Sequence, residues 1–200
     1  MRYPPGHKQE ARARLIAAAG RGFRKHGFGG VGIDGLASEA QVTSGAFYGH
    51  FPSKEAAFRE ALAAGLEDLR NGVKTCREQA GPGWLEPFVD FYLGHRRLCD
   101  LGESCALQSL TPEVERADPL TRTTYQTALL AIVDAITEGF EGGAIAAETC
   151  QSRARAWALL AMLSGGVGMA RAVQDPEVSA AIARSVRESA LRAAWIGAET

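Results

Sequence analysis

The sequence predicts an all-α protein, and three observations support that fold class. Residues with high helix propensity (Ala, Leu, Arg and Glu) dominate the 200 residues, and runs of β-branched residues are scarce. Apolar residues recur at helical spacing, as at Leu15, Ala19 and Phe23. No segment alternates apolar and polar residues as a half-buried strand does. We expect about nine helices, which form a three-helix head (residues 1–52) and a larger helical body (residues 53–200).

Local signals set the ends of the helices in the head. Gly27 is typical of a left-handed C-terminal cap, Thr43 is a predicted N-cap, and Pro52 stops the helix before it. The predicted head helices cover residues 8–26, 33–40 and 44–50.

Similar signals mark the body. Ser53 is a predicted N-cap, and Asp118-Pro119 and Asp175-Pro176 each combine a capping residue with a proline suited to the first helical position. The predicted body helices cover residues 54–77, 84–101, 103–110, 118–140, 148–173 and 176–196.

Several protein classes are not expected. The sequence has no run of about 20 apolar residues that could span a membrane, and its polar N-terminus lacks the apolar stretch of a secretory signal, so we expect a cytoplasmic protein. It has no Gly-rich phosphate loop, HExxH or GxSxG motif, so we expect neither an enzyme nor a cofactor. His95, Cys99 and Cys105 are too loosely spaced to predict a metal site.

The charge is distributed unevenly along the chain. The net charge is −1, but residues 1–60 hold nine Lys and Arg against five Asp and Glu. A basic head on an acidic body indicates that the head meets an anionic partner.

The second and third predicted helices have the pattern of a helix-turn-helix. They are short, a three-residue turn joins them, and a longer first helix braces them. Ala37 is small enough for a close crossing, and Val42 is a suitable apolar plug for the turn. Phe47 and Phe51 form an apolar inner face. The opposite face carries small or polar residues, as a helix that enters the major groove requires: Thr43, Ser44, Gly45, Ala46 and His50.

Residues 10–60 resemble the DNA-binding signature of the tetracycline-repressor (TetR) family. The resemblance rests on Gly27-Phe28, on Leu36-Ala37-Ser38-Glu39-Ala40, and on the run from Val42 to Glu55. It implies that the recognition helix begins at Thr43, Ser44, Gly45 and Ala46, and that Tyr48, with His50 beside it, and Lys54 contact DNA phosphates.

Alternatives to these roles remain open. Tyr48 could instead pack in the head, and His50 could be a residue held at a helix end. A helical scaffold protein would also explain the helices, although it would not explain the small residues at 43–46 beside Tyr48 and Lys54.

The sequence departs from the family pattern at two places. Val31-Gly32 stands where the family has Ser or Thr before the second helix, which removes a side-chain cap. Gln41 stands where the turn has Gly, so either a left-handed residue is strained there or the turn differs.

The resemblance implies that the body forms a homodimer through its last two helices and binds a small-molecule effector. Gly165, Gly166 and Gly168 interrupt a long helix and would allow two backbones to approach closely, although packing within one chain is the alternative. The residues predicted to line an effector pocket, each of which could equally be ordinary core, are Phe88, Phe91, Tyr92, Cys105, Tyr125 and Trp157, with Trp84 a further candidate.

The segment from Gly102 to Leu107 resembles one in a branch of the family that includes an N-ethylmaleimide-sensing repressor. It makes Cys105 a candidate reactive thiol, provided that a helix N-terminus or a cation such as Arg96 or Arg97 lowers its pKa. A small buried residue is the alternative, and no disulfide is expected among the four separated cysteines.

The predicted function is therefore that of a DNA-binding transcriptional regulator. We expect a repressor that leaves a palindromic operator when its effector binds, with activation as the alternative. The partners expected are double-stranded operator DNA, a second copy of the chain and the effector, and no membrane.

Overall fold

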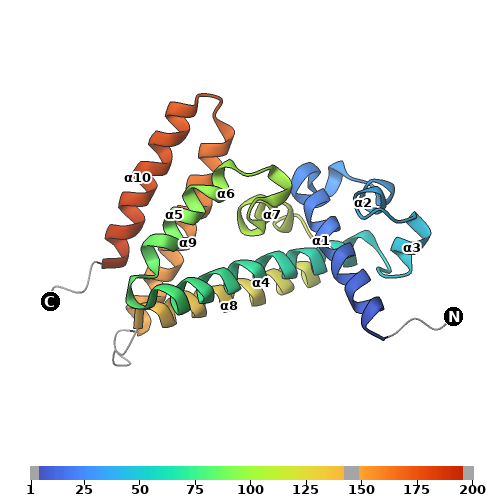
Figure 1. Ribbon diagram of the computed structural model, residues 1–200, viewed down its shortest axis with the longest axis horizontal. Helices are drawn as coiled ribbons and strands as arrows, with labels where there is room; N and C mark the ends of the chain where they lie inside the picture. The colour runs from blue at the N-terminus through green and yellow to red at the C-terminus, as the bar shows by residue number, and fades with distance from the viewer. Residues whose placement is uncertain (1–4, 142–148, 196–200) are drawn as a thin grey trace. The chain divides into compact units, whose positions relative to one another are not determined.

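The computed structural model describes residues 5–141 and 149–195, in which all regular structure is helical (Figure 1). The all-α prediction is confirmed. The chain divides into a first unit, Met1–Leu66 with Asp100–Gln126, and a second unit, Glu67–Cys99 with Thr127–Thr200. Helices α4 (Lys54–Ala80) and α8 (Pro119–Glu141) contribute residues to both units. The functional boundary at residue 52 stays a prediction.

Helix α1 (Pro5–Gly30) contains a kink where the sequence predicted its end. Gly27 adopts a left-handed conformation with φ of 73°, and one further helical turn follows it. The kink brings Phe28 back onto the core of the first unit. Its ring stacks on Phe23 at a centroid distance of 6.0 Å and meets the edge of Phe58 at 5.3 Å.

Helices α2 (Ile33–Glu39) and α3 (Ser44–Tyr48) form the predicted helix-turn-helix. Leu36 of α2 is fully buried, and a Cβ on Gly22 of α1 would lie 2.8 Å from its Cδ2, so α1 and α2 are in close contact. Helix α3 ends at Tyr48 rather than at residue 50. It ends early because Gly49, a poor helix former, is its C-cap and Pro52 follows shortly after.

The short helix predicted at 103–110 begins and ends later in the chain than predicted. A 3₁₀ turn, η2 (Leu101–Glu103), precedes helix α7 (Ala106–Val114). Asp100 caps the turn by accepting a hydrogen bond from the amide of Gly102 at 2.9 Å. The turn is fixed in the first unit because the guanidinium of Arg24 donates to the carbonyl of Gly102 at 2.5 Å.

The prediction of a single helix over residues 84–101 is also wrong. After a 3₁₀ turn, η1 (Gly81–Gly83), the chain forms helix α5 (Leu85–Leu93) and a separate short helix, α6 (His95–Leu98). Gly94 breaks the helix with φ of −88° and ψ of −84°. A Cβ there would lie 2.7 Å from the carbonyl oxygen of Asp90, so only glycine fits this conformation without strain.

Helices α9 (Thr149–Ala172) and α10 (Pro176–Trp195) pack against each other in the second unit (Figure 1). The glycines of α9 do not interrupt it, contrary to the prediction. A Cβ on Gly166 would lie 2.7 Å from Val186 of α10, so this glycine permits a close helix contact within the chain. Arg187 of α10 binds Asp90 and Glu86 of α5 at 2.5 and 2.6 Å.

In the part of the chain that the structure describes, none of the helices combines the length and the apolar character needed to cross a bilayer.

Candidate nucleic-acid interface

Helix α3 begins with the side-chain cap that the sequence predicted. Thr43 is extended, with φ of −80° and ψ of 155°, and its Oγ1 accepts a hydrogen bond from the amide of Ala46 at 3.2 Å. The cap satisfies one of the amide groups that a helix leaves unpaired in its first turn. It therefore fixes where the recognition helix begins.

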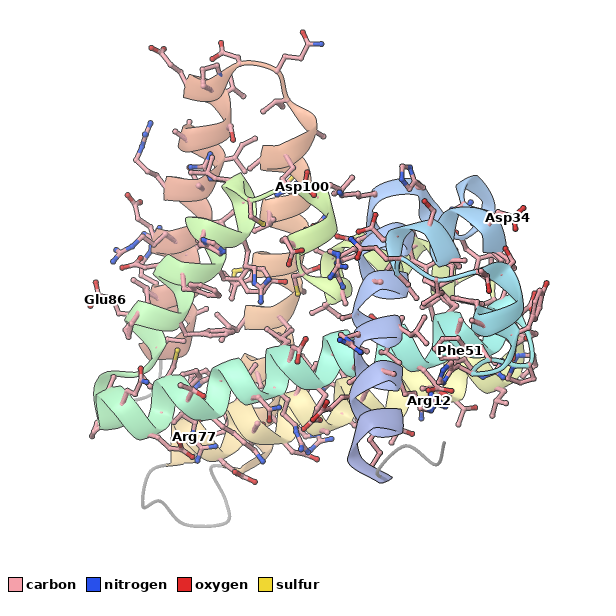
Figure 2. All side chains as sticks on the ribbon, turned by 45° about the vertical axis from the view of Figure 1, so that its right-hand side comes forward. Arg12, Asp34, Phe51, Arg77, Glu86 and Asp100 are labelled. Carbon is pink, nitrogen blue, oxygen red and sulfur yellow. The ribbon has the colours of Figure 1, made fainter. Side chains whose placement is uncertain are left out.

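The inner face of α3 is anchored by two aromatic side chains. Phe47 and Phe51 are fully buried, and their ring centroids are 5.0 Å apart. The guanidinium of Arg12 lies 5.3 Å from the centre of the Phe51 ring (Figure 2) and binds both carboxylate oxygens of Glu60, at 2.6 and 2.8 Å. Helices α1 and α4 thus hold this face in place, and the prediction that both phenylalanines are core is confirmed.

The outer face of α3 is open. Thr43, Gly45, Ala46 and Tyr48 are all exposed. A Cβ on Gly45 would have no neighbour closer than the hydroxyl of Thr43 at 4.0 Å, so packing within the chain does not require glycine here. The missing side chain leaves the backbone accessible from outside, as close approach to another molecule requires.

The aromatic and basic residues that follow lie in different surroundings. The side chain of Tyr48 is 55% exposed, so it is no part of the head's core. His50 is half-buried, and its backbone amide donates to the carbonyl of Phe47 at 3.0 Å. The ammonium of Lys54 lies 4.5 Å from the centre of the Phe28 ring, a cation–π contact that holds it at the start of α4.

The structure adds Asp34, in the first turn of α2, to this face. The hydroxyl of Ser44 donates to its carboxylate at 2.5 Å. Asp34 is exposed, so it brings a negative charge to the start of α3 (Figure 2 labels Asp34). The spacing of ten residues between the two side chains follows no helical period, and the sequence pattern therefore offered no signal for the pair.

Both departures from the family pattern have structural consequences. Gly32 is the N-cap of α2 and provides no side-chain hydrogen bond, so the predicted loss of a cap is confirmed. Gln41 has φ of 56°, which is the left-handed conformation that favours glycine. Its amide donates to the carbonyl of Ser38 at 3.0 Å, so the turn keeps its hydrogen bonds in spite of this strain.

The residues predicted to line an effector pocket are distributed over both units. In the second unit, Phe88 and Tyr92 are buried, while Phe91 and Trp157 are exposed. In the first unit, Cys105 is buried, and the hydroxyl of Tyr125 lies 2.9 Å from that of Thr111. None of these six residues lines either of the two cavities described below, and their role stays a prediction.

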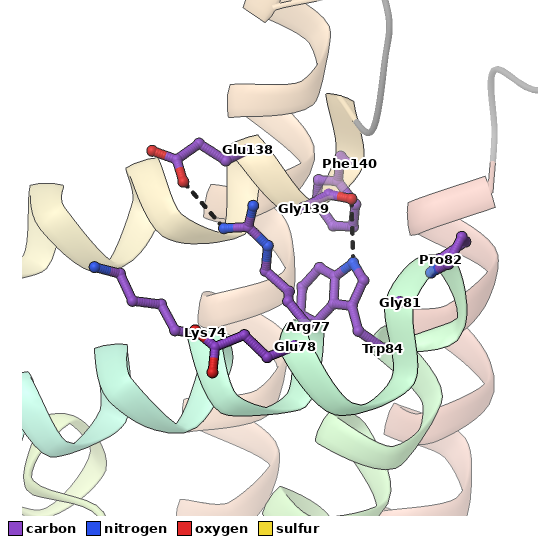
Figure 3. A pocket seen from close by; sticks show the side chains of 9 residues that line it. All are labelled: Lys74, Arg77, Glu78, Gly81, Pro82, Trp84, Glu138, Gly139 and Phe140. Carbon is purple, nitrogen blue, oxygen red and sulfur yellow. Dashed lines mark hydrogen bonds and ion pairs between the residues drawn. The ribbon is translucent and has the colours of Figure 1, made fainter.

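The larger cavity, of about 790 Å³, lies in the second unit where α4 and α8 end (Figure 3). Trp84, a residue that the sequence analysis named as possible lining, forms part of its wall and donates from its indole nitrogen to the carbonyl of Gly139 at 3.1 Å. Arg77 donates to the carboxylate of Glu138 at 3.0 Å across the same cavity. Lys74 and Glu78 add one further charge of each sign to the lining.

Cys105 lies at a helix N-terminus, one of the two surroundings named for a reactive thiol, but its side chain is buried. It is the N-cap residue of α7, but only 4% of its surface is exposed. The guanidinium of Arg97 donates to the carbonyl of Leu93 and the hydroxyl of Ser179, and that of Arg96 lies over the Phe91 ring. The described residues contain no group of three or more His, Cys, Asp and Glu side chains that could hold a metal ion.

Comparison with known proteins decides the family. Residues 15–61, which include the whole helix-turn-helix, match the model of the bacterial regulatory proteins of the tetR family. Over these residues the chain matches the TetR family. It is 27% identical over 141 residues to the HTH-type transcriptional repressor SCO4008 of Streptomyces coelicolor, and the match covers 68% of each chain. It is 24% identical over 138 residues to the repressor DhaR of a Mycobacterium species, covering 67% of this chain and 69% of DhaR.

Solved structures of the TetR family share the fold of this chain. SCO4454 of Streptomyces coelicolor is 24% identical, with a TM-score of 0.69 over 92% of this chain and 95% of the other. The reduced form of NemR of Escherichia coli is 17% identical, with a TM-score of 0.73 over 90% of this chain and 96% of NemR. These structures show the fold, while the family match and the two repressor relatives indicate a DNA-binding transcriptional regulator.

Proposed function

We propose that this TetR-family regulator is a repressor that binds a palindromic operator as a homodimer and leaves it when a small-molecule effector binds. The observation that carries the proposal is the division of α3 into two faces. Phe47 and Phe51 are fully buried, while the face with Gly45 and Tyr48 is open. A short helix of this shape presents its outer face to the major groove.

Specific contacts follow from the exposed groups. The backbone at Gly45 and the small side chain of Ala46 allow α3 to approach base edges. The hydroxyl groups of Thr43 and Tyr48 and the ammonium of Lys54 are suited to phosphate oxygens, because hydroxyls and cations supply most backbone contacts to DNA. The Ser44 hydroxyl must first release Asp34 before it can donate to a phosphate. His50 lies at the end of the same segment. These roles follow from the match to the family and from the exposure of the face.

A dimer supplies the two heads that a palindrome requires. In the second unit, one side of α9 packs on α10 through Gly166 and Val186. Gly165 has open space where its Cβ would be, and Met169 and Val178 are 57% and 45% exposed. Apolar surface of this kind on the last two helices favours their pairing with the same helices of a second chain, since association would remove it from water.

The cavity in Figure 3 is the candidate effector site, because its volume of about 790 Å³ falls within the range of small-molecule pockets. Its wall combines the Trp84 indole with charges of both signs. An effector releases DNA only if it binds the free form of the dimer more tightly than the DNA-bound form. Repression, rather than activation, is favoured because both relatives, SCO4008 and DhaR, are named repressors.

Fluorescence anisotropy tests the proposal, with a labelled duplex from the DNA that flanks the protein's own gene and a scrambled duplex of equal composition. We expect tighter binding to the first duplex, two chains per duplex, and an affinity that falls as salt rises. Equal binding to both duplexes would argue against operator recognition by these flanking sequences. Absence of binding to either duplex at low salt would contradict the proposed interface.

A further inference from the structure

A second cavity, of about 320 Å³, lies within the first unit. It is enclosed by the end of α1, the start of α4, the end of α7 and the start of α8. Its volume is at the lower end of the range for small-molecule sites. Its lining includes none of the predicted DNA contacts and none of the predicted effector residues. The side chains that matter for its chemistry are Phe28, Glu55, Phe58, Glu113, Arg116 and Asp118.

Aromatic rings form one wall of this cavity. Phe28 and Phe58 meet at a centroid distance of 5.3 Å, with their ring planes at 69°. The ring of Phe28 already binds one cation, because the ammonium of Lys54 lies 4.5 Å from its centre. The face of an aromatic ring carries negative electrostatic potential, so this wall favours a positively charged or apolar ligand over an anion.

The carboxylate of Glu113 lies against the backbone of α1. A Cβ on Gly27 would lie 2.7 Å from its Oε1, so the carboxylate lies against the backbone where the long first segment of α1 ends. Glu113 is half-buried, and its side chain has neither a hydrogen-bond partner nor an ion-pair partner in the described part of the chain.

Among the described residues, the other charged groups around the cavity form no side-chain hydrogen bond or ion pair with Glu113. Asp118 caps α8 through Thr121 and forms an ion pair with Arg59 at 3.6 Å. Arg116, which also lines the cavity, is exposed; its backbone amide donates to the carbonyl oxygen of Glu113, and no ion pair joins their side chains in the described part of the chain. A carboxylate that lines a cavity beside aromatic rings, without a cation of its own, is a typical recognition group for an organic cation.

We propose that this cavity binds a small organic cation that carries one aromatic ring. The ring packs against Phe28 and Phe58, and the ammonium group donates to the carboxylate of Glu113. This binding site goes beyond the proposed DNA-binding function, and its test contains no DNA, so failure of one proposal leaves the other intact.

Isothermal titration calorimetry of the full-length protein tests the site with three probes that share a phenyl ring. These are phenethylammonium, neutral 2-phenylethanol and anionic phenylacetate. The variants are Glu113→Gln, which keeps the size of the side chain, and Glu115→Gln, which removes the same charge from an exposed residue outside the cavity. Circular dichroism melting curves of both variants establish that they fold.

We expect phenethylammonium to bind at one site per chain, and both other probes to bind at least about tenfold more weakly. Glu113→Gln should weaken binding of the cation about tenfold, since a charge-assisted hydrogen bond contributes roughly that much, while Glu115→Gln should leave it unchanged. The proposal is overturned if the cation does not bind, if the alcohol binds equally well, or if Glu113→Gln binds the cation like the unmodified protein. The last result would place the cation at another site, such as the cavity of the second unit.

Discussion

The hydroxyl of Ser44 donates a 2.5 Å hydrogen bond to the carboxylate of Asp34. This bond links the first residue of the recognition helix to the first turn of α2, and it holds a negative charge on the surface proposed to face DNA. The charge opposes binding to every phosphate nearby, whatever the base sequence. Asp34 therefore reduces non-specific affinity while it orients Ser44.

Asp34→Asn should strengthen binding to DNA. The amide oxygen can still accept from Ser44, but the repulsion of phosphates is lost, and a charge about 4 Å away is worth roughly 1 kcal/mol in water. We expect affinity for operator and scrambled duplexes to rise up to about fivefold in anisotropy titrations. Asp68→Asn removes an exposed charge outside the head and should change neither affinity. Weaker binding of Asp34→Asn to the operator alone would instead show that the carboxylate accepts from a base amino group.

Lys54→Met should weaken binding to operator and scrambled DNA alike. Methionine keeps an apolar chain against the Phe28 ring and removes only the charge that is proposed to meet a phosphate. The slope of log affinity against log salt should decrease by roughly one unit for the lost contact. Tyr48→Phe should also weaken binding to both duplexes through loss of its hydroxyl. A salt slope unchanged in Lys54→Met would exclude a phosphate contact by this lysine.

Gln41→Gly should stabilise the protein. A left-handed conformation costs a residue with a Cβ about 1–2 kcal/mol, and the added flexibility of glycine in the unfolded chain offsets roughly half of the gain. We expect the free energy of unfolding, measured with urea, to rise by about 0.5–1 kcal/mol. Gln126→Gly is the matched control, because Gln126 is an exposed residue in the interior of α8. It should lower the same quantity by about 1 kcal/mol. A Gln41→Gly variant that is no more stable than the unmodified protein would contradict strain at this turn.

Cys105 should react slowly with electrophiles in the folded protein. Its thiol is buried, whereas Cys76 and Cys99 are half-buried. Burial also raises the pKa of the Cys76 thiol, which lowers the reactivity of that site at neutral pH. Timed labelling with N-ethylmaleimide and peptide mass spectrometry should therefore find Cys99 modified before Cys105.

A sensor role for Cys105 requires that N-ethylmaleimide modify Cys105 before Cys99. If Cys105 is labelled first, and if Cys105→Ser no longer releases DNA after treatment with the electrophile, the thiol-sensor hypothesis is supported. If the variant still releases DNA, another group senses the electrophile.

Features that depend on neighbouring residues were predictable from the sequence. Thr43, Ser53 and Asp118 cap their helices as expected, because each side chain bonds an amide three residues ahead. The left-handed backbone at Gln41 is one of the two outcomes that the resemblance left open, the other being a different turn. The burial of Phe47 in α3 and of Phe51 just after it was predictable as well, because the two residues lie four positions apart.

The break at Gly94 was not predictable from neighbouring residues alone. The low helix propensity of Gly94 was visible in the sequence, but the apolar pattern around it favoured one continuous helix. The actual backbone conformation at Gly94 depends on the contacts of α5 and α6 with α9, since each packs on that helix. Similarly, only the folded chain shows that Phe91 and Trp157 are exposed and that Phe88 is buried.

The sequence by itself determined the helical fold, the position of the recognition helix and the family. These depend on propensity, on caps and on spacing within a few residues. Tertiary structure alone decided that Ser44 binds Asp34, that Lys54 lies on Phe28 and that Glu113 lies against Gly27 without a cation. Each of these contacts joins residues from different helices, and its geometry depends on how those helices pack.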